Sequence, residues 1–295
     1  MEAGPLRDAL TLLLGFATGV LSALFGIGGA IVSNPGLRAL GAAPLVAVGT
    51  TLPSILPGAI SGTLRYRREG LIDWRLVTPA AAAGLLAVVG GSLLSHVVPG
   101  EGHLLLLLIA VLLAFTAWRT AVTSPGSEPA EGETGGGDGR EHPISPSATL
   151  PLRGTSRQEA GFSRGGSTAR LRWRAAGIGV VAGLLSGLLG IGGGVIMVPA
   201  FTELLSLSLK SAIATSLVCV GIFGVPATIT HAFLGDIDWR LATLLTIGVI
   251  PGARVGASLT IRTAERRLRL AVGVFLALVA LVYFVTETRA LLEEL

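Results

Sequence analysis

Apolar stretches long enough to cross a lipid bilayer recur along this sequence, and they constrain its fold more than any other feature. A helix needs about 20 apolar residues to cross the hydrocarbon core of a membrane. Eight stretches approach this length: 9–25, 44–64, 76–95, 103–121, 173–189, 211–232, 241–261 and 268–286. Only 14% of the residues are charged, against about 25% in ordinary soluble domains. We therefore expect an all-α integral membrane protein with about eight transmembrane helices.

One long segment between the fourth and fifth stretches differs from the rest. Residues 122–170 are rich in Gly, Pro, Ser and charged side chains. Such a segment buries too little apolar surface to offset the entropy lost on ordering. We expect a first transmembrane repeat at 1–121, a disordered linker at 122–170 and a second transmembrane repeat at 171–295.

The two halves resemble each other in sequence. GVLSALFGIGGAIVSNP (19–35) aligns with GLLSGLLGIGGGVIMVP (183–199), with 9 of 17 positions identical, and GLIDWRL (70–76) aligns with GDIDWRL (235–241). Matches in the same order at nearly constant spacing indicate an internal duplication, and internal repeats are typical of transporter folds. We expect two four-helix repeats, each of which opens with a helix broken at the glycine-rich motif.

Arginines near the ends of the apolar stretches predict an orientation, because basic residues concentrate on the cytoplasmic side of a membrane. With four crossings in each half, more of them fall on the side of the amino terminus. This distribution favours a multi-pass protein of the cytoplasmic membrane, with both termini in the cytoplasm and both halves running in the same direction. Four arginines fit an inverted second half better: Arg262, Arg266, Arg267 and Arg269.

The glycine-rich motif is followed by a proline in both halves. The motif positions are Gly26, Gly28, Gly29 and Pro35, then Gly190, Gly192, Gly193, Gly194 and Pro199. Glycine reaches backbone conformations that other residues avoid, and proline lacks the amide donor of a helical bond. Together they predict a break inside or near the membrane that leaves N–H groups free, at a positive helix end that suits an anion. The alternative is that the glycines only allow close helix packing.

Several polar side chains lie within the apolar stretches or close to them, where such groups tend to be functional. The further candidates for substrate contacts are Asn34, Thr50, Thr51, Thr215, Ser216, His231 and Arg254. Each has a structural alternative: a hydroxyl can bond to a carbonyl of its own helix, and Arg254 can extend its side chain to the interface. Asp73 and Asp238, which precede Trp-Arg in both halves, are expected to begin helices.

Other function classes find little support. No Asp or Glu lies within an apolar stretch, and no HExxH, Cys/His cluster or nucleophile-elbow motif occurs. We therefore expect no enzyme activity, no metal site and no cofactor. No Gly-Lys-Ser/Thr follows the glycines, which argues against a nucleotide-binding loop. The basic residues lie at the ends of the apolar stretches, so we expect no nucleic-acid partner.

The paired glycine motifs, together with H-x-x-x-G-x-I-D-W-R-L from His231 to Leu241, resemble the sulfite exporter TauE/SafE family. The resemblance covers 9–121 and 173–286. It implies a helical bundle with seven or eight spans in the cytoplasmic membrane, and transport of sulfur-containing anions such as sulfite or organosulfonates. In the first half, Ala30 stands where the motif has a final glycine and Tyr66 where it has the histidine.

We therefore expect a secondary transporter or facilitator that moves a small anion, sulfite or an organosulfonate, across the cytoplasmic membrane. Its partners would be the lipid bilayer and the anion, while the oligomeric state does not follow from the sequence. Two alternatives stay open: a transporter of another small solute, such as a carboxylate or a metal ion, and a non-transporting membrane scaffold whose linker binds a partner.

Overall fold

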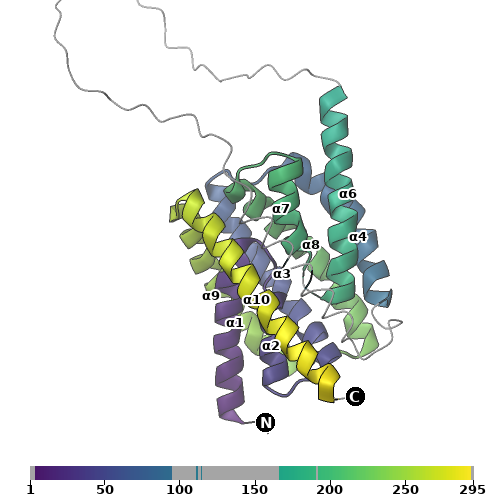
Figure 1. Ribbon diagram of the computed structural model, residues 1–295, viewed down its shortest axis with the longest axis vertical. Helices are drawn as coiled ribbons and strands as arrows, with labels where there is room; N and C mark the ends of the chain where they lie inside the picture. The colour runs from purple at the N-terminus through teal and green to yellow at the C-terminus, as the bar shows by residue number, and fades with distance from the viewer. Residues whose placement is uncertain (1–3, 95–110, 112–113, 115–165, 191, 294–295) are drawn as a thin grey trace, which may run out of the picture.

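A computed structural model describes residues 4–94, 111, 114, 166–190 and 192–293, and Figure 1 shows the arrangement of its helices. These residues form α-helices and no strand, which confirms the expected all-helical class. The helices are α1 (Pro5–Phe25), α2 (Ala30–Ala39), α3 (Pro44–Arg68), α4 (Trp74–Leu94), α6 (Gly166–Leu189), α7 (Gly194–Leu204), α8 (Leu209–Leu234), α9 (Trp239–Arg262) and α10 (Glu265–Glu293).

Two expectations from the sequence fall largely outside these residues. The stretch 103–121 was expected to cross the membrane, and 122–170 was expected to be a linker. Both lie outside the described residues apart from positions 111 and 114 and the start of α6 at Gly166.

Five of the described helices are long and apolar enough to cross a membrane: α1, α3, α4, α8 and α9. Large apolar side chains stay exposed on the outside of the bundle, for example Leu86 at 80% and Phe233 at 89% of the accessible surface of the residue. Lipid accommodates such side chains, whereas water would drive them into contact with other apolar surfaces. The fold is therefore that of an integral membrane protein.

Glycines hold α1 and α9 in close parallel contact. A Cβ atom added to Gly248 would clash with the carbonyl oxygen of Leu12, and one added to Gly256 would clash with that of Val20. Because later residues of α9 contact later residues of α1, the two helices run in the same direction. Small residues of this kind allow two backbones to approach each other within a membrane.

The same packing joins α4 to α6. A Cβ atom on Gly179 would clash with the carbonyl oxygen of Ala80, and one on Gly187 would clash with that of Val88. These two helices are therefore also parallel. Each pair combines the first helix of one half of the sequence with the helix after the IDWR motif of the other half.

The long helices α3 and α8 cross each other in the core and run antiparallel. A Cβ atom on Gly221 would lie 2.6 Å from Ala59 Cβ, and one on Gly62 would lie 2.7 Å from Leu217 Cδ2. Short turns join α3 to α4 and α8 to α9, so the members of each of these hairpins are also antiparallel. It follows that α1, α3 and α9 run one way, and α4, α6 and α8 run the other.

The expected common direction of the two halves is wrong. In Figure 1, α1 begins at the lower end of the bundle and α6 begins at the upper end. The reason is that α2 folds back beside α1: a Cβ atom on Gly29 would lie 2.6 Å from Thr18 Cγ2, and one on Gly36 would lie 2.5 Å from Leu14 Cδ1. A short returning helix in each half adds a reversal of direction that a count of full-length stretches omits.

Candidate functional site

The two glycine motifs form loops with nearly the same backbone conformation. Gly26 and Gly190, which end α1 and α6, have φ angles of 70° and 63°. Gly29 and Gly193, which precede α2 and α7, have φ angles of 75° and 70°. Residues with a Cβ atom rarely adopt this left-handed region, so glycine is required for the break. The predicted interruptions are therefore present, at Gly26–Gly29 in the first half and between the end of α6 and the start of α7 in the second.

The loops from the two halves contact each other inside the protein. A Cβ atom on Gly194 would clash with the carbonyl oxygen of Gly26, and one on Gly192 would lie 3.4 Å from Gly28 Cα. All four of these glycines are buried. The fold therefore brings two segments that are 164 positions apart in the sequence to one place. We call residues 26–29 and 190–193 the glycine loops.

Side-chain hydroxyls satisfy three of the backbone carbonyls at the end of α1. Tyr66 donates a hydrogen bond to the carbonyl oxygen of Ala23. Thr260 donates to that of Leu24 at 3.0 Å, and Ser216 donates to that of Gly26 at 2.9 Å. The three hydroxyls come from α3, α9 and α8, so both halves of the chain contribute to this end.

The amide groups of the glycine loops show the opposite behaviour. Among the described residues, the N–H groups of Gly28, Gly29, Gly192 and Gly193 donate no hydrogen bond. Neither α2 nor α7 has a side chain that caps its amino end. Buried N–H groups without a partner are rare in proteins. The site thus presents free donors next to three carbonyls, those of Ala23, Leu24 and Gly26, that are already paired, and it suits a guest that accepts hydrogen bonds.

The helix dipoles add to this preference. Both α2 and α7 begin at the glycine loops, and Figure 1 shows them extending toward opposite ends of the bundle. Their positive amino ends therefore face the same buried place. A group with negative charge would be stabilised there, and a cation would be repelled.

Two predicted site residues, Asn34 and Thr51, contact each other close to the loops. Thr51 Oγ1 lies 2.9 Å from Asn34 Oδ1 and 2.8 Å from the carbonyl oxygen of Ala47. Asn34 is on α2, a little more than one turn after Gly29, and is only 3% exposed. Pro35 and Pro199 lie within α2 and α7. The short helices therefore continue past their prolines.

Thr50 and Thr215 contact the turn of the opposite half. The N–H of Asp238 donates to Thr50 Oγ1 at 2.9 Å, and that of Asp73 donates to Thr215 Oγ1 at 3.1 Å. The structure thus places these two hydroxyls on backbone amides of the IDWR turns. Ser216 is the one member of the hydroxyl group that bonds directly to a glycine loop.

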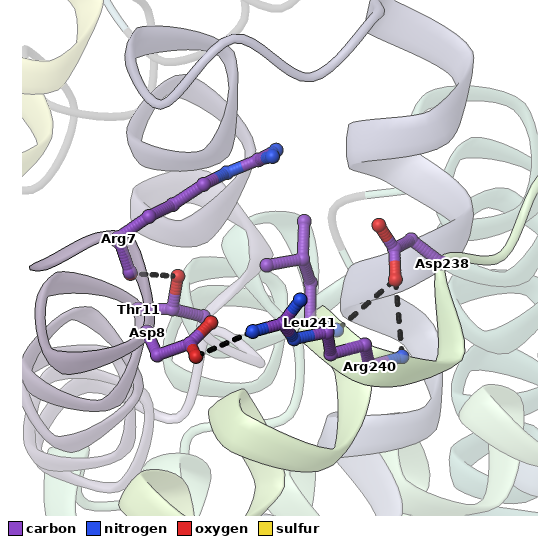
Figure 2. A network of polar contacts seen from close by, with 6 residues as sticks. All are labelled: Arg7, Asp8, Thr11, Asp238, Arg240 and Leu241. Atoms are coloured by element: carbon purple, nitrogen blue, oxygen red, sulfur yellow. Dashed lines mark hydrogen bonds and ion pairs between the residues drawn. The ribbon is translucent and has the colours of Figure 1, made fainter. Parts of the chain in front are cut away.

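The expectation that Asp73 and Asp238 begin helices is confirmed. Figure 2 shows that one carboxylate oxygen of Asp238 accepts from the N–H groups of Arg240 and Leu241, at 3.0 and 3.2 Å. Asp73 accepts from the N–H of Arg75 at 3.0 Å. The Arg240 side chain also forms an ion pair of 2.7 Å with Asp8 on α1, which ties the start of α9 to the start of α1.

His231 and Arg254 occupy different surroundings. His231 is fully buried, and its Nδ1 lies 2.9 Å from Asp236 Oδ2 in the turn after α8. Arg254 is exposed, whereas the neighbouring Gly252 and Gly256 face α1. No polar contact within the described part of the chain joins Arg254 to the glycine loops.

Reasoning from the sequence missed Thr260 and the hydroxyl of Tyr66. Tyr66 was noted only as the residue that replaces a histidine, and Thr260 lies in a stretch that was considered for Arg254 alone. The partner of Thr260 is 236 positions away. No local sequence pattern identifies such a bond; a hydroxyl near the end of an apolar stretch is the only signal. Among the described residues, no group of His, Cys, Asp or Glu could hold a metal ion.

A helical membrane protein in which two interrupted helices meet at their positive ends has the arrangement that secondary transporters use, and this fold and site define a membrane transporter. Comparison with known families makes the assignment specific. The chain belongs to the sulfite exporter TauE/SafE family, whose model matches residues 11–283.

Relatives of the chain carry names of the same kind. A "Probable membrane transporter protein" of Xylella fastidiosa (strain 9a5c) is 26% identical over 253 residues, which cover 85% of this chain and 82% of the relative. The "Probable membrane transporter protein YunE" of Bacillus subtilis (strain 168) is 25% identical over 293 residues, covering 92% of this chain and 94% of the relative. No solved structure matches the chain significantly. These names support transport and specify no substrate beyond the one in the family name.

Proposed function

We propose that the chain is a secondary transporter or facilitator that carries a small anion, sulfite or an organosulfonate, across the cytoplasmic membrane and holds it at the glycine loops. One observation carries the proposal. At the place where α1 and α2 separate, the carbonyls of Ala23, Leu24 and Gly26 are bonded to hydroxyls, while the amides of Gly28 and Gly29 have no partner among the described residues. A site where free donors adjoin three carbonyls that are already bonded favours an anion over a cation.

The strength of such a site fits a carrier. One helix amino end contributes up to about 2 kcal/mol to an anion in a partly buried geometry. Two ends that act together contribute up to about 4 kcal/mol, which corresponds to a dissociation constant of about 1 mM. A carrier has to release its substrate on the far side, so weak binding is compatible with the role.

The shape of the substrate follows from the number of donors. Sulfite and the head group of a sulfonate each present three oxygen atoms in a compact arrangement. Gly28 and Gly29 offer two free amides, and Gly192 and Gly193 offer two more from the other half. Donors from two directions can engage all three oxygens at once, whereas a carboxylate has only two oxygens to offer.

The proposal includes the arrangement of the chain in the membrane. We propose eight full crossings in two inverted repeats, 1–121 and 171–295, joined by 122–170. The repeated motifs and the opposite directions of α1 and α6 support it. In a cell with a negative interior, export of a monoanion gains about 2.3 kcal/mol per 100 mV, so that efflux needs no coupled ion.

The test is anion flux in proteoliposomes, with two glycine variants that carry the same backbone strain. Gly192 and Gly235 have φ angles of 87° and 80°. A Cβ atom on Gly192 would lie 3.4 Å from Gly28 Cα, inside the site, whereas one on Gly235 meets nothing within 4 Å. We expect G235A to keep wild-type sulfite flux and G192A to lose it by about ten-fold, equivalent to roughly 1.4 kcal/mol of binding.

Three outcomes contradict the proposal. If flux of sulfite, sulfonates and small carboxylates is no higher than in empty liposomes, the protein is not an anion carrier. If G192A and G235A show equal flux, the glycine loops are not the binding site of the anion. Flux of carboxylates alone keeps an anion site and overturns the sulfur substrate. Size-exclusion profiles of both purified variants verify that each is folded.

A further inference from the structure

Basic side chains gather at one end of the helix bundle. This is the upper end in Figure 1, where α6 and α10 begin. It carries three arginines in RYRR (65–68), Arg75, three in RLRWR (170–174), Lys210 and four in RTAERRLR (262–269). These twelve residues come from the ends of α3 and α9 and the starts of α4, α6, α8 and α10, and we call them the basic rim.

The opposite end has few basic residues. Arg7, Arg38 and Arg240 lie there, and Arg289 near the end of α10 is the fourth. Arg240 is already neutralised by its ion pair with Asp8. Among the described residues, the contrast is therefore twelve Lys and Arg residues against four. This difference between the two ends depends on the helix directions in the structure. If both halves ran in the same direction, the same basic residues would be distributed differently between the two ends.

Most of the rim is exposed, and most of its arginines form no ion pair with another described residue. Within the described part of the chain, Arg65 of the rim forms an ion pair with Glu69 at 2.7 Å, and Arg269 forms one with Glu265 at 3.7 Å. The arginines at 67, 68, 75, 170, 172, 174, 262, 266 and 267 are all exposed to the surroundings of the bundle. Among the described residues, no acidic side chain pairs with these nine arginines, so their charge is available to a negatively charged partner.

Two tryptophans place the rim at the level of lipid head groups. Trp74 is 51% exposed and Trp173 is 78% exposed, and each is next to a rim arginine in the sequence. Exposed tryptophans at the ends of membrane helices lie in the head-group region. The rim cations are therefore positioned where phosphate groups of lipids are found.

We infer that the basic rim faces the cytoplasm and binds the anionic phospholipid head groups of the inner leaflet. The amino end of α1, the turn between α8 and α9 and the carboxyl end of α10 then lie on the outer side of the membrane. Two physical rules support the inference: basic residues stay on the cytoplasmic side, and clustered arginines attract anionic lipids. This is the reverse of the orientation expected from the sequence, and it is independent of the proposed anion site.

A matched pair of cysteine variants tests the orientation. Gly70 and Gly235 occupy equivalent turns at opposite ends, have φ angles of 68° and 80°, and have nothing within 4 Å of an added Cβ atom. We expect a membrane-impermeant maleimide to label G235C in spheroplasts, and G70C only in inside-out vesicles. The wild-type chain is the blank, because its single cysteine, Cys219, is buried. The reverse pattern, or labelling of both variants from one side, overturns the inference.

The lipid partner has its own test, thermal unfolding of the purified protein in detergent. Phosphatidylglycerol is expected to raise the Tm by about 3 °C or more relative to phosphatidylcholine, since a ligand that binds only the folded state stabilises it. The triple variant R170Q/R172Q/R174Q should lose at least half of this shift. The control R240Q, at the opposite end, should keep it. Equal shifts with the two lipids, or a full shift in the triple variant, overturn the lipid assignment.

Discussion

The hydroxyl of Tyr66 shows how single residues complete the backbone at the broken helix. It is fully buried on α3 and donates to the carbonyl oxygen of Ala23, near the end of α1. A carbonyl at a helix end has no helical partner, and in a membrane no water is at hand to replace it. Tyr66, Thr260 and Ser216 together let α1 stop inside the protein.

Removing that hydroxyl should weaken the fold. Y66F leaves the Ala23 carbonyl buried without its donor, which costs about 1–3 kcal/mol. Thermal unfolding in detergent measures the loss as a lower Tm. T243V is the matched control, because the exposed Thr243 hydroxyl bonds only to Trp239, one turn earlier on its own helix. A Tm for Y66F equal to that of T243V would show that the bond contributes nothing.

Ser216 should affect transport more than stability. S216A leaves the Gly26 carbonyl oxygen without its donor at the glycine loop, where its partial negative charge repels an anion. We expect the KM for sulfite to rise about five-fold with little change in the maximal rate, because about 1 kcal/mol of binding is lost. S211A, one turn into the same helix and half-buried, is the control. An unchanged KM for S216A would show that Ser216 does not contribute to anion binding.

At the scale of elements, α2 and α7 are the features that the sequence only partly predicted. The glycines and prolines predicted where the chain breaks. They did not predict that α2, from Ala30 to Ala39, would return beside α1, since periodicity carries no information on direction. A helix of 10 residues is also too short to be recognised as a span. Because α2 reverses the direction of the chain, the second half runs opposite to the direction that a count of full-length stretches predicts.

Adjacent glycines on α4 test the close packing of helices. A Cβ atom on Gly91 would clash with the Leu184 carbonyl oxygen and lie 2.8 Å from Leu188 N, whereas one on Gly90 meets nothing within 4 Å. We expect G91A to lose about 1–3 kcal/mol through overpacking, and G90A to be neutral or slightly stabilising. Thermal unfolding of the two variants, measured under the same conditions, compares their Tm values. Equal Tm values would mean that α4 and α6 are not held at this distance.

At the scale of the whole molecule, each half of the chain completes the other. α1 packs on α9, α6 packs on α4, and the turns after α3 and α8 bond to Thr215 and Thr50 of the opposite half. The sequence predicted a duplication from its repeated motifs. It could not predict which helices pair, because helices from both halves are apolar over most of their length and alternative pairings bury similar surface.

This exchange of contacts predicts that the halves need each other and do not need the segment between them. Residues 1–121 and 171–295, expressed together as separate chains, should copurify through a tag on either one, and each expressed alone should aggregate. Deletion of 122–165, which stops before α6 begins at Gly166, should leave sulfite flux within about two-fold of wild type, a change worth roughly 0.4 kcal/mol. A membrane scaffold that acts through this segment would instead lose its function. Halves that are stable alone would contradict the packing described.

The central claim is that two helix amino ends hold one anion between them, and the most direct measurement locates that anion. Selenite has the charge and shape of sulfite, and selenium scatters X-rays anomalously. Crystals of the protein grown with selenite should show one anomalous peak within hydrogen-bonding reach of the amides of Gly28 and Gly192. A peak at Arg254 instead, or none at the glycine loops while sulfite flux is intact, would contradict the account.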